Sequence, residues 1–167
     1  AAFSFYANKN ITTGGEGGAV STNDSRLAGK VRELSLHGMS KDGWERYKGG
    51  GSWAYDVSEL GYKYNMTDVA ACFGLEQLQH LQSWQGRRVE IVQRYQNGLR
   101  NIQGLILPHQ DNQLTHAWQL FIIQIRPVEW QIDRNTLIEK LNQLGIGASV
   151  HYIPVHMHSY YAGKYGW

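Results

Sequence analysis

The sequence is poor in cysteine, in long apolar runs and in clustered charge. Cys72 is the only cysteine among 167 residues, which excludes an intrachain disulfide and fits a reducing compartment, so we expect a cytoplasmic protein. No apolar run approaches the roughly 18 residues that span a bilayer. Lysine and arginine number 16 against 14 aspartates and glutamates, a net charge of +2, and they are scattered along the chain. We therefore expect no binding to nucleic acid or to a membrane.

A short segment near the start combines an apolar strand, an isolated lysine and a glycine-dense turn. Residues 3–20 are FSFYANKNITTGGEGGAV. The alternation over Phe3–Tyr6 predicts a short strand with one buried face, and Lys9 follows where the chain leaves that strand. Several glycines come next, and their lack of a Cβ permits a sharp turn or a close approach to another group. This order of residues places Lys9 at the end of a stiff element.

Two interpretations of Lys9 follow from the residues alone. An exposed ammonium with a pKa of about 10.4 is neutral in only roughly one molecule in a few thousand at pH 7, so it is a poor nucleophile. Once condensed with an aldehyde cofactor, the lysine becomes useful, because the imine exchanges readily with an incoming amine. The alternative is a solvated surface lysine beside a glycine turn. The glycines match neither GxGxxG nor the phosphate-binding loop of nucleotide hydrolases, so they predict no nucleotide-binding loop.

The rest of the chain alternates between strand and helix patterns. Strands are expected at 18–22, 105–107, 118–125 and 148–153, the third of these mostly buried on both faces. Helices are expected from a cap at Asn23 or Asp24 to Gly38, from a cap at Thr67 or Asp68 to 81, from Gly86 to 102, from Asp133 to a left-handed stop at Gly145, and over 160–165. An apolar face is expected on the second helix at Val69, Phe73, Leu78 and Leu81. The series predicts an α/β domain.

The stretch from 39 to 62 is irregular. It holds a glycine triplet at 49–51 and the aromatic residues Trp44, Tyr47, Trp53 and Tyr55. A loop of this length inside a compact domain is usually functional or disordered. A mobile surface loop and a loop whose aromatic side chains pack against another surface both remain open as interpretations.

Lys63 and Asn65 are candidates for binding an anion. They come just before the helix that Thr67 opens. The start of a helix offers free N–H groups and a positive partial charge, both of which attract a phosphate. The sequence alone therefore predicts a phosphate contact here.

Three histidines near the end of the chain, His151, His156 and His158, were considered as zinc ligands. On a strand that runs into Pro154 they need not face one point, and no HExxH pattern accompanies them. We therefore predict no metal site.

Four segments, in this order, resemble one protein family. They are FSFYANKN with TTGGEGGAV, LHGMSKDGWERY, ELGYKYNMTDVAACFGLEQL, and GIGASVHYIPVH. Together they are similar to the DegT-type family of pyridoxal-phosphate sugar aminotransferases over nearly the whole chain. The resemblance implies the C-terminal part of a fold type I aminotransferase. Residues 1–66 would be a remnant of the large cofactor-binding domain with its long loop, and 67–167 a small α/β domain with a short sheet, flanking helices and the connecting helices.

The resemblance also implies roles for single residues. Lys9 would form the imine with pyridoxal 5'-phosphate, and Ser4 would hydrogen-bond the phosphate of that cofactor. Lys63 and Asn65 would reach across a homodimer to the partner's cofactor phosphate. Many relatives have asparagine and arginine at these two places, so either residue can make the contact here. His151 would lie near the sugar substrate, with a structural histidine as the alternative.

Two more substrate contacts are implied by the same resemblance. Tyr55, with the other aromatic residues of the long loop, would pack against the second subunit's active site. His37, at the entrance to that loop, is a substrate-binding candidate of the same kind as His151.

The activity that the resemblance implies is transfer of an amino group from an amino acid such as glutamate to a nucleotide-linked keto sugar. Some members have histidine in place of the lysine and are dehydratases, so Lys9 favours transamination. Members normally have a roughly equal length of chain before this point, so we expect these 167 residues alone to be inactive. One alternative is a noncatalytic remnant that acts only as a dimerisation or interaction module. Another is that the preceding half lies upstream on the same gene or on another chain.

Overall fold

The computed structural model describes residues 1–40, 55–111 and 113–166. Trp44, Tyr47 and Trp53 of the long loop therefore lie outside the described residues. The chain divides into two compact units. The first consists of Ala1–Val92 with Thr115–Leu120, and the second of Gln93–Leu114 with Phe121–Trp167. Helices and short sheets occur in both, as the α/β pattern predicted.

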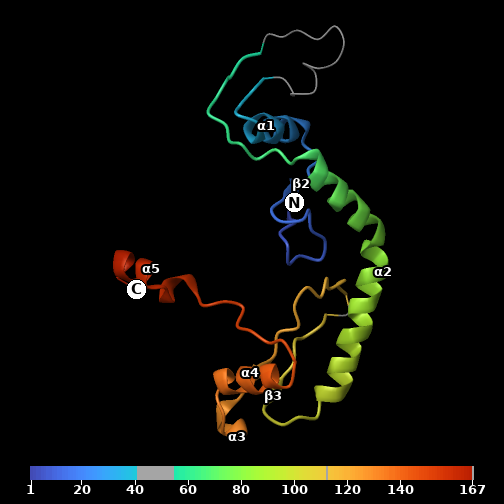
Figure 1. Ribbon diagram of the computed structural model, residues 1–167, viewed down its shortest axis with the longest axis vertical. Coiled ribbons are helices and arrows are strands. Elements are labelled where there is room, and N and C mark those ends of the chain that lie inside the picture. Colours follow the sequence, from blue (N-terminus) through green and yellow to red (C-terminus); the bar gives the residue numbers. More distant parts are fainter. Residues whose placement is uncertain (41–54, 112, 167) are drawn as a thin grey trace. The chain divides into compact units, whose positions relative to one another are not determined.

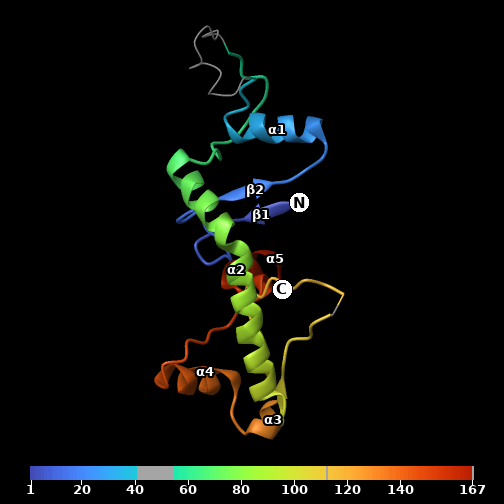
Figure 2. The same ribbon diagram turned by 90° about the vertical axis from the view of Figure 1, so that its right-hand side faces the viewer.

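The first unit begins with a two-stranded antiparallel hairpin. β1 (Ala2–Ser4) pairs with β2 (Gly18–Val20), so that Phe3 lies opposite Ala19 (Figure 2). Both predicted strands are present but short. The predicted buried face is wrong, since Phe3 is 53% exposed and neither strand holds a buried residue. In the described part of the chain this sheet has two strands only, and so narrow a ribbon shields little apolar surface.

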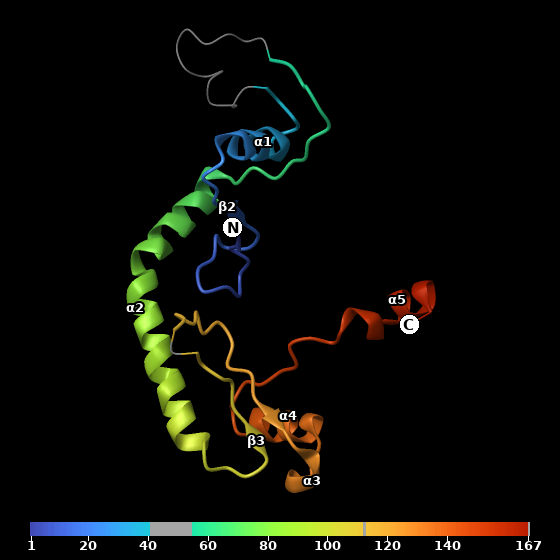
Figure 3. The same ribbon diagram turned by 180° about the vertical axis from the view of Figure 1, so that it is seen from behind.

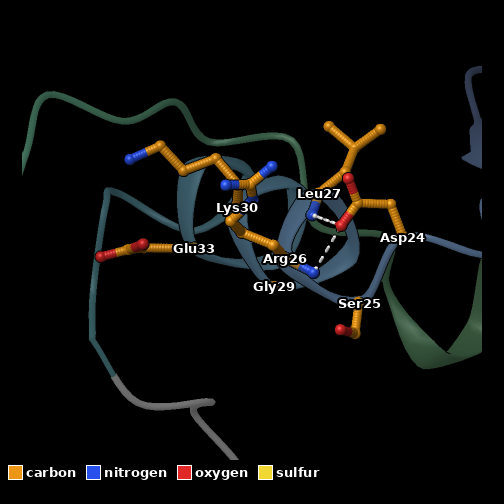
Figure 4. Close-up of a pocket in the computed structure, with 7 residues that line it drawn as sticks. All are labelled: Asp24, Ser25, Arg26, Leu27, Gly29, Lys30 and Glu33. Atoms are coloured by element: carbon orange, nitrogen blue, oxygen red, sulfur yellow. Dashed lines mark hydrogen bonds between the residues drawn. The ribbon is translucent and has the colours of Figure 1, made fainter.

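α1 (Ser25–Ser35) starts at Asp24. The Oδ1 atom of Asp24 accepts the backbone N–H groups of Arg26 at 2.9 Å and Leu27 at 3.1 Å, as Figure 4 shows. Asp24 rather than Asn23 is therefore the cap. After the helix, Gly38 has a left-handed φ of 73°, and its N–H donates to the Glu33 carbonyl at 2.9 Å. The predicted stop at Gly38 is confirmed.

Residues 61–64 run beside the end of α1. The N–H of Tyr62 donates to the Leu34 carbonyl at 2.7 Å, and the N–H of Tyr64 donates to the Ser35 carbonyl at 2.8 Å. In return, the N–H of His37 donates to the Tyr62 carbonyl at 2.8 Å. These bonds attach the segment that carries Lys63 to a fixed helix end.

Two glycines allow this contact between backbones. A Cβ added to Gly38 would lie 2.0 Å from the Glu59 carbonyl oxygen, and one added to Gly61 would lie 2.0 Å from the Gly38 nitrogen. Lys30 of α1 also forms an ion pair with Glu59, and this hydrogen bond raises the pKa of Lys30 above its ordinary value. The segment is thus held to α1 by both backbone and side-chain contacts.

α2 (Asp68–Leu99) is one continuous helix of 32 residues (Figure 1). The predicted break at Gly86 is wrong. A glycine in a helix interior is less favourable than alanine by only about 1 kcal/mol, and no proline occurs in this stretch, so the helical hydrogen bonds continue through it. Thr67 caps the helix as predicted, because its Oγ1 accepts the N–H of Ala70 at 3.3 Å.

The second unit holds a small sheet and short helices. β3 (Leu105–Ile106) pairs antiparallel with β4 (Gln124–Ile125). α3 (Pro127–Trp130), α4 (Arg134–Gln143), the 3-10 turn η2 (Val155–Met157) and α5 (Ser159–Tyr165) follow (Figure 3). The start and stop of α4 agree with the prediction, since Asp133 accepts the N–H of Thr136 at 2.8 Å and Gly145 has a φ of 75°.

Two predicted strands are not formed as expected. Within 118–125 only Gln124 and Ile125 join a ladder. The left-handed φ of 47° at Trp118 removes that residue from any extended strand. Ile122 is also 53% exposed, so burial on both faces is wrong. Residues 148–153 pair with no strand in the described part of the chain. There the Ala148 N–H donates to Asn142 Oδ1 at 3.2 Å instead.

Few apolar side chains are buried within the described residues. Val92 and Trp118 are each 5% exposed. The face predicted at the start of α2 is open, with Val69 71% and Phe73 53% exposed. An apolar stripe of this kind is buried only where another surface covers it. None of the helices in the described ranges has the length and apolar character that crossing a bilayer requires.

The close approach at Gly38 predicts opposite effects of alanine at two nearby glycines. Gly38→Ala should lower the free energy of unfolding by at least about 1 kcal/mol, since a non-glycine residue is strained at positive φ and its Cβ would overlap the Glu59 carbonyl. Gly29→Ala, in α1 with no atom within 4 Å of the added Cβ, should raise stability by about 0.5–1 kcal/mol. Urea unfolding measures both. Equal destabilisation by the two variants would contradict the described backbone contact.

Asp133 predicts a pH-dependent contribution to stability. Its hydrogen bonds with Thr136 hold the pKa of Asp133 below its ordinary range. A carboxyl group with a lowered folded pKa stabilises the fold above its unfolded pKa, near 4, and that contribution is lost as the pH falls through the folded value. Asp133→Ala should therefore lower the Tm at pH 7 by at most a few degrees, and the difference should shrink toward pH 2.

Asp133→Asn is the control for this experiment, because asparagine caps a helix about as well but does not titrate. Thermal unfolding should show the Tm difference between Asp133→Asn and Asp133→Ala at pH 7 and at pH 2 alike. If wild type and Asp133→Ala have the same Tm at every pH, the cap contributes nothing.

Candidate functional site

Lys9 lies in the loop that joins β1 to β2. Its side chain is half-buried, and its backbone N–H donates to the Tyr6 carbonyl at 2.9 Å, which closes a tight turn directly after the strand. Further along, the N–H of Phe5 donates to the Gly17 carbonyl at 2.8 Å, and the N–H of Thr13 donates to the Phe5 carbonyl at 3.1 Å. The loop therefore folds back on itself around the lysine.

Thr13 is the buried centre of this loop, at 5% exposure. Its Oγ1 donates to the Glu16 carbonyl at 2.9 Å. A Cβ on Gly17 would lie 2.0 Å from that same Oγ1, so no larger residue fits at position 17. Gly14, with a φ of 91°, makes the turn between them. The sharp turn that the glycines predicted is confirmed at Gly14, and the close approach is confirmed at Gly17.

The loop is attached to α2 and to the segment Thr115–Leu120 of the same unit. The N–H of Thr12 donates to Gln77 Oε1 at 2.9 Å, and Arg88 Nη2 lies 3.4 Å from the Asn10 carbonyl oxygen. On its other side, Asn10 Nδ2 donates to the Ala117 carbonyl at 2.7 Å. The residues on either side of Lys9 are therefore fixed by hydrogen bonds.

The sequence analysis missed Gln77 and Arg88. They are eleven residues apart, which is close to three helical turns, so both project from one side of α2. Gln77 also precedes Leu78, in a helix whose predicted face is defined by its apolar residues alone. Polar residues that recur on one side of such a helix are the signal that could have identified them.

Ser4 is the last residue of β1 and is exposed. Its Oγ accepts the N–H of Tyr6 at 3.4 Å, which leaves the hydroxyl hydrogen available to donate. Ser4 and Lys9 thus belong to one hairpin, five residues apart. No hydrogen bond of the described residues joins them directly.

Lys63 and Asn65 are brought together. Lys63 Nζ donates a hydrogen bond to Asn65 Oδ1. The rings of Tyr62 and Tyr64 stack at 4.9 Å between centroids. A hollow of about 580 Å³ adjoins Asn65 and is lined by Gly29, Arg32, Glu33, Ser35, Leu36, Met39, Ser40, Ser58 and Asn65. The two predicted phosphate-binding residues therefore form one polar pair at the start of α2.

The three predicted substrate residues are all exposed. His37 has a positive φ of 61° at the end of α1, and Tyr55 begins the described segment that returns toward it. His151 belongs to the second unit, where its ring lies 3.8 Å from that of Tyr152, centroid to centroid. Their roles in binding a substrate stay predictions.

Two other features do not form a binding site for a phosphate or a metal ion among the described residues. A hollow of about 690 Å³ lies against the start of α1, between Asp24 and Glu33 (Figure 4). The Asp24 carboxylate already accepts two N–H groups there and would repel an anion, so this helix start does not suit a phosphate. Among the described residues, no group of three or more His, Cys, Asp or Glu side chains is arranged to hold a metal ion.

Three known proteins are similar to this chain over nearly its whole length. The spore coat polysaccharide biosynthesis protein SpsC of Bacillus subtilis (strain 168) is 48% identical over 99% of this chain and 43% of its own length. The putative sugar aminotransferase Spr1654 from Streptococcus pneumoniae, in its PMP form, is 34% identical with a TM-score of 0.80, over 98% of this chain and 42% of that one. DesV of S. venezuelae, in complex with a ketimine intermediate, is 32% identical with a TM-score of 0.82, over 98% and 40%.

The chain thus spans less than half the length of these relatives. Its fold is the one found in aminotransferase structures over 98% of its residues, so the predicted fold is confirmed. The predicted family is confirmed as well, because the family match extends over residues 1–166. On this evidence the chain belongs to the DegT/DnrJ/EryC1/StrS aminotransferase family.

Proposed function

We propose that this chain is part of a pyridoxal-phosphate-dependent enzyme that transfers an amino group from an amino acid, such as glutamate, to a nucleotide-linked keto sugar. The observation that carries the proposal is the half-buried Lys9 in a loop whose neighbouring residues are fixed to α2 and to Ala117. Membership of the aminotransferase family supports it. So do the PMP and PLP forms of Spr1654 and the role named for SpsC in polysaccharide biosynthesis.

The residues present suit a cofactor that has an aldehyde and a phosphate. Lys9 supplies a primary amine on a fixed loop. Ser4 has a hydroxyl hydrogen free to donate. Lys63 uses one of its three ammonium hydrogens on Asn65, which leaves two for an anion. We propose that Lys9 and Ser4 hold the cofactor from one protomer and that Lys63 and Asn65 contact its phosphate from the partner protomer.

Pyridoxal phosphate, when bound, draws electrons away from the Cα of the amino donor. The remaining work belongs to side chains of this protein. With the cofactor held there, Lys9 would move a proton from the donor Cα toward the cofactor, and it would act in the reverse sense on the keto sugar. Hydrogen bonds at the Lys9 N–H, the Asn10 carbonyl and the Thr12 N–H fix the backbone from which this amine extends.

Contacts to the sugar are assigned to exposed side chains. We propose that His151 binds a sugar hydroxyl or a phosphate oxygen through its ring nitrogens. Tyr55 and His37 are proposed as further contacts from the segments beside the end of α1.

We also propose that a domain boundary lies between residues 66 and 67.

A homodimer in the cytoplasm completes the proposal. The support is the exposed apolar surface in the described residues, including Leu60 at 91% exposure and the open start of α2, since apolar patches of this kind favour association. The same surface also fits the second candidate function, a noncatalytic dimerisation module. The two candidates differ in whether Lys9 binds a cofactor.

Lys9→Ala tests the enzyme directly. The test uses the longest natural polypeptide that contains this sequence. Added pyridoxal phosphate should produce an absorbance band that borohydride abolishes, and the mass of the cofactor should remain on the peptide that holds Lys9. Lys9→Ala should lose both the band and transamination, the latter by at least roughly 10²-fold, as expected for loss of a general acid–base group. Lys140→Ala, a lysine in the last turn of α4, is the matched control and should behave as wild type. A band of equal strength in Lys9→Ala would refute the assignment.

Mixing variants tests the contact across the dimer. Lys9→Ala protomers lack the amine, and Lys63→Ala protomers lack the phosphate contact, so each homodimer should have low activity. In a randomly mixed population, half of the dimers carry both variants and one of their two sites is intact, so activity should return to about one quarter of the wild-type level. If Lys63 serves the site of its own protomer, mixing restores nothing.

A further inference from the structure

We propose that Gln77 and Arg88 of α2 are positioning residues for Lys9. They hold the loop of residues 5–17 and thereby fix the place from which the lysine amine reacts. The inference rests on the proposed function of Lys9, because it assigns these residues no contact with cofactor or substrate. Each has a hydrogen bond with a backbone group of the loop.

The two contacts lie immediately after Lys9 in the sequence. Gln77 accepts the N–H of Thr12 at 2.9 Å, and Arg88 approaches the carbonyl of Asn10 to 3.4 Å. The turn from Tyr6 to Lys9 fixes the backbone on the preceding side. The lysine Cα is therefore held from both directions, and α2 provides the rigid element on one of them.

Arg88 differs from its neighbour in a way that supports this role. Arg87 is exposed and forms an ion pair with Glu90 at 2.7 Å. Arg88 is half-buried, and its Nη1 atom is fully buried with no hydrogen-bond partner in the described part of the chain. The buried part of a guanidinium needs acceptors nearby. The Asn10 carbonyl is an acceptor that the structure places beside it.

The loop also packs closely on α2. Gly74 lies under Thr13, and a Cβ on Gly74 would be 3.0 Å from Thr13 Cγ2. Asn10 is bonded on its other side to Ala117. The loop is thus held between the helix and a second segment of the same unit, and Gln77 and Arg88 supply the polar contacts from the helix.

Positioning of this kind affects the chemical step more than substrate binding. A lysine that moves a proton between two carbon atoms needs its nitrogen within about 3 Å of each, and a misplacement of about 1 Å can lower the rate by roughly 10²-fold. A small displacement of the loop backbone is carried to the end of a long, flexible side chain. Loss of the Gln77 and Arg88 contacts with the loop should therefore lower kcat and leave KM nearly unchanged.

Variants of the two residues, made in the longest natural polypeptide that contains this sequence, test the proposal. Gln77→Ala and Arg88→Ala remove the contacts. Gln79→Ala and Arg87→Ala, on the same helix and exposed, are the controls. Gln77→Glu keeps an acceptor for the Thr12 N–H and should restore most of what Gln77→Ala loses.

Hydrogen exchange of the cofactor-free protein is the first measurement. The peptide that spans residues 5–17 should exchange roughly 10-fold faster in Gln77→Ala and Arg88→Ala than in wild type, because the Thr12 amide and its neighbours lose protection. The controls should leave it unchanged. If Arg88→Ala does not fold, Gln77→Ala and its Gln77→Glu rescue decide the result. Unchanged exchange in Gln77→Ala would overturn the proposal.

Kinetics and spectra of the loaded protein are the second measurement. Both alanine variants should keep the Lys9-dependent absorbance band, shift the pH midpoint of that band, and lower kcat by roughly 10- to 100-fold at nearly constant KM. A normal kcat and midpoint in the presence of a loosened loop would also overturn the proposal. Absence of the band in wild type, with faster exchange in the variants, would instead refute the function proposed for Lys9 and leave the loop contact in place.

Discussion

The order of the loop of residues 5–17, which holds Lys9, depends on the burial of Thr13 against α2. A single small side chain, 5% exposed, occupies the centre of the loop and donates to the Glu16 carbonyl. Gly17 on one side and Gly74 on the other leave room for it and for little else. Because the threonine fills this space, the backbone around it is brought within hydrogen-bonding distance of Gln77 and Arg88. The loop is ordered by packing as much as by its own hydrogen bonds.

Local signals predicted the ends of elements well. Asp24, Thr67 and Asp133 were expected as caps, and each accepts a backbone N–H of the helix that it begins. Gly38 is expected to end its helix and Gly145 to be a left-handed stop, and both have positive φ. Such signals are readable because a cap or stop depends on residues only a few positions away.

Features that depend on distant residues were not predictable in the same way. Gly86 predicts a break between two helices, but the hydrogen bonds of α2 continue through it and outweigh the low helix propensity of glycine. The strand expected at 148–153 has no neighbour in the described part of the chain that could pair with it. Gln77 was overlooked because its role is set by Thr12, 65 residues earlier. The motif resemblance identified the family and predicts a role for Lys9, but it carries no information about what holds the loop.

The hydrogen bond from Lys63 to Asn65 affects how tightly the Lys63 ammonium would bind an anion. A free lysine side chain samples many rotamers, and restricting it fully lowers its entropy by an amount equivalent to about 1.5–2 kcal/mol. In this chain part of that restriction already exists in the folded protein, because the ammonium is tethered to an amide two residues away. An anion that meets the two remaining N–H groups would order less of the side chain on arrival. Preorganisation of this kind strengthens an encounter without adding any contact.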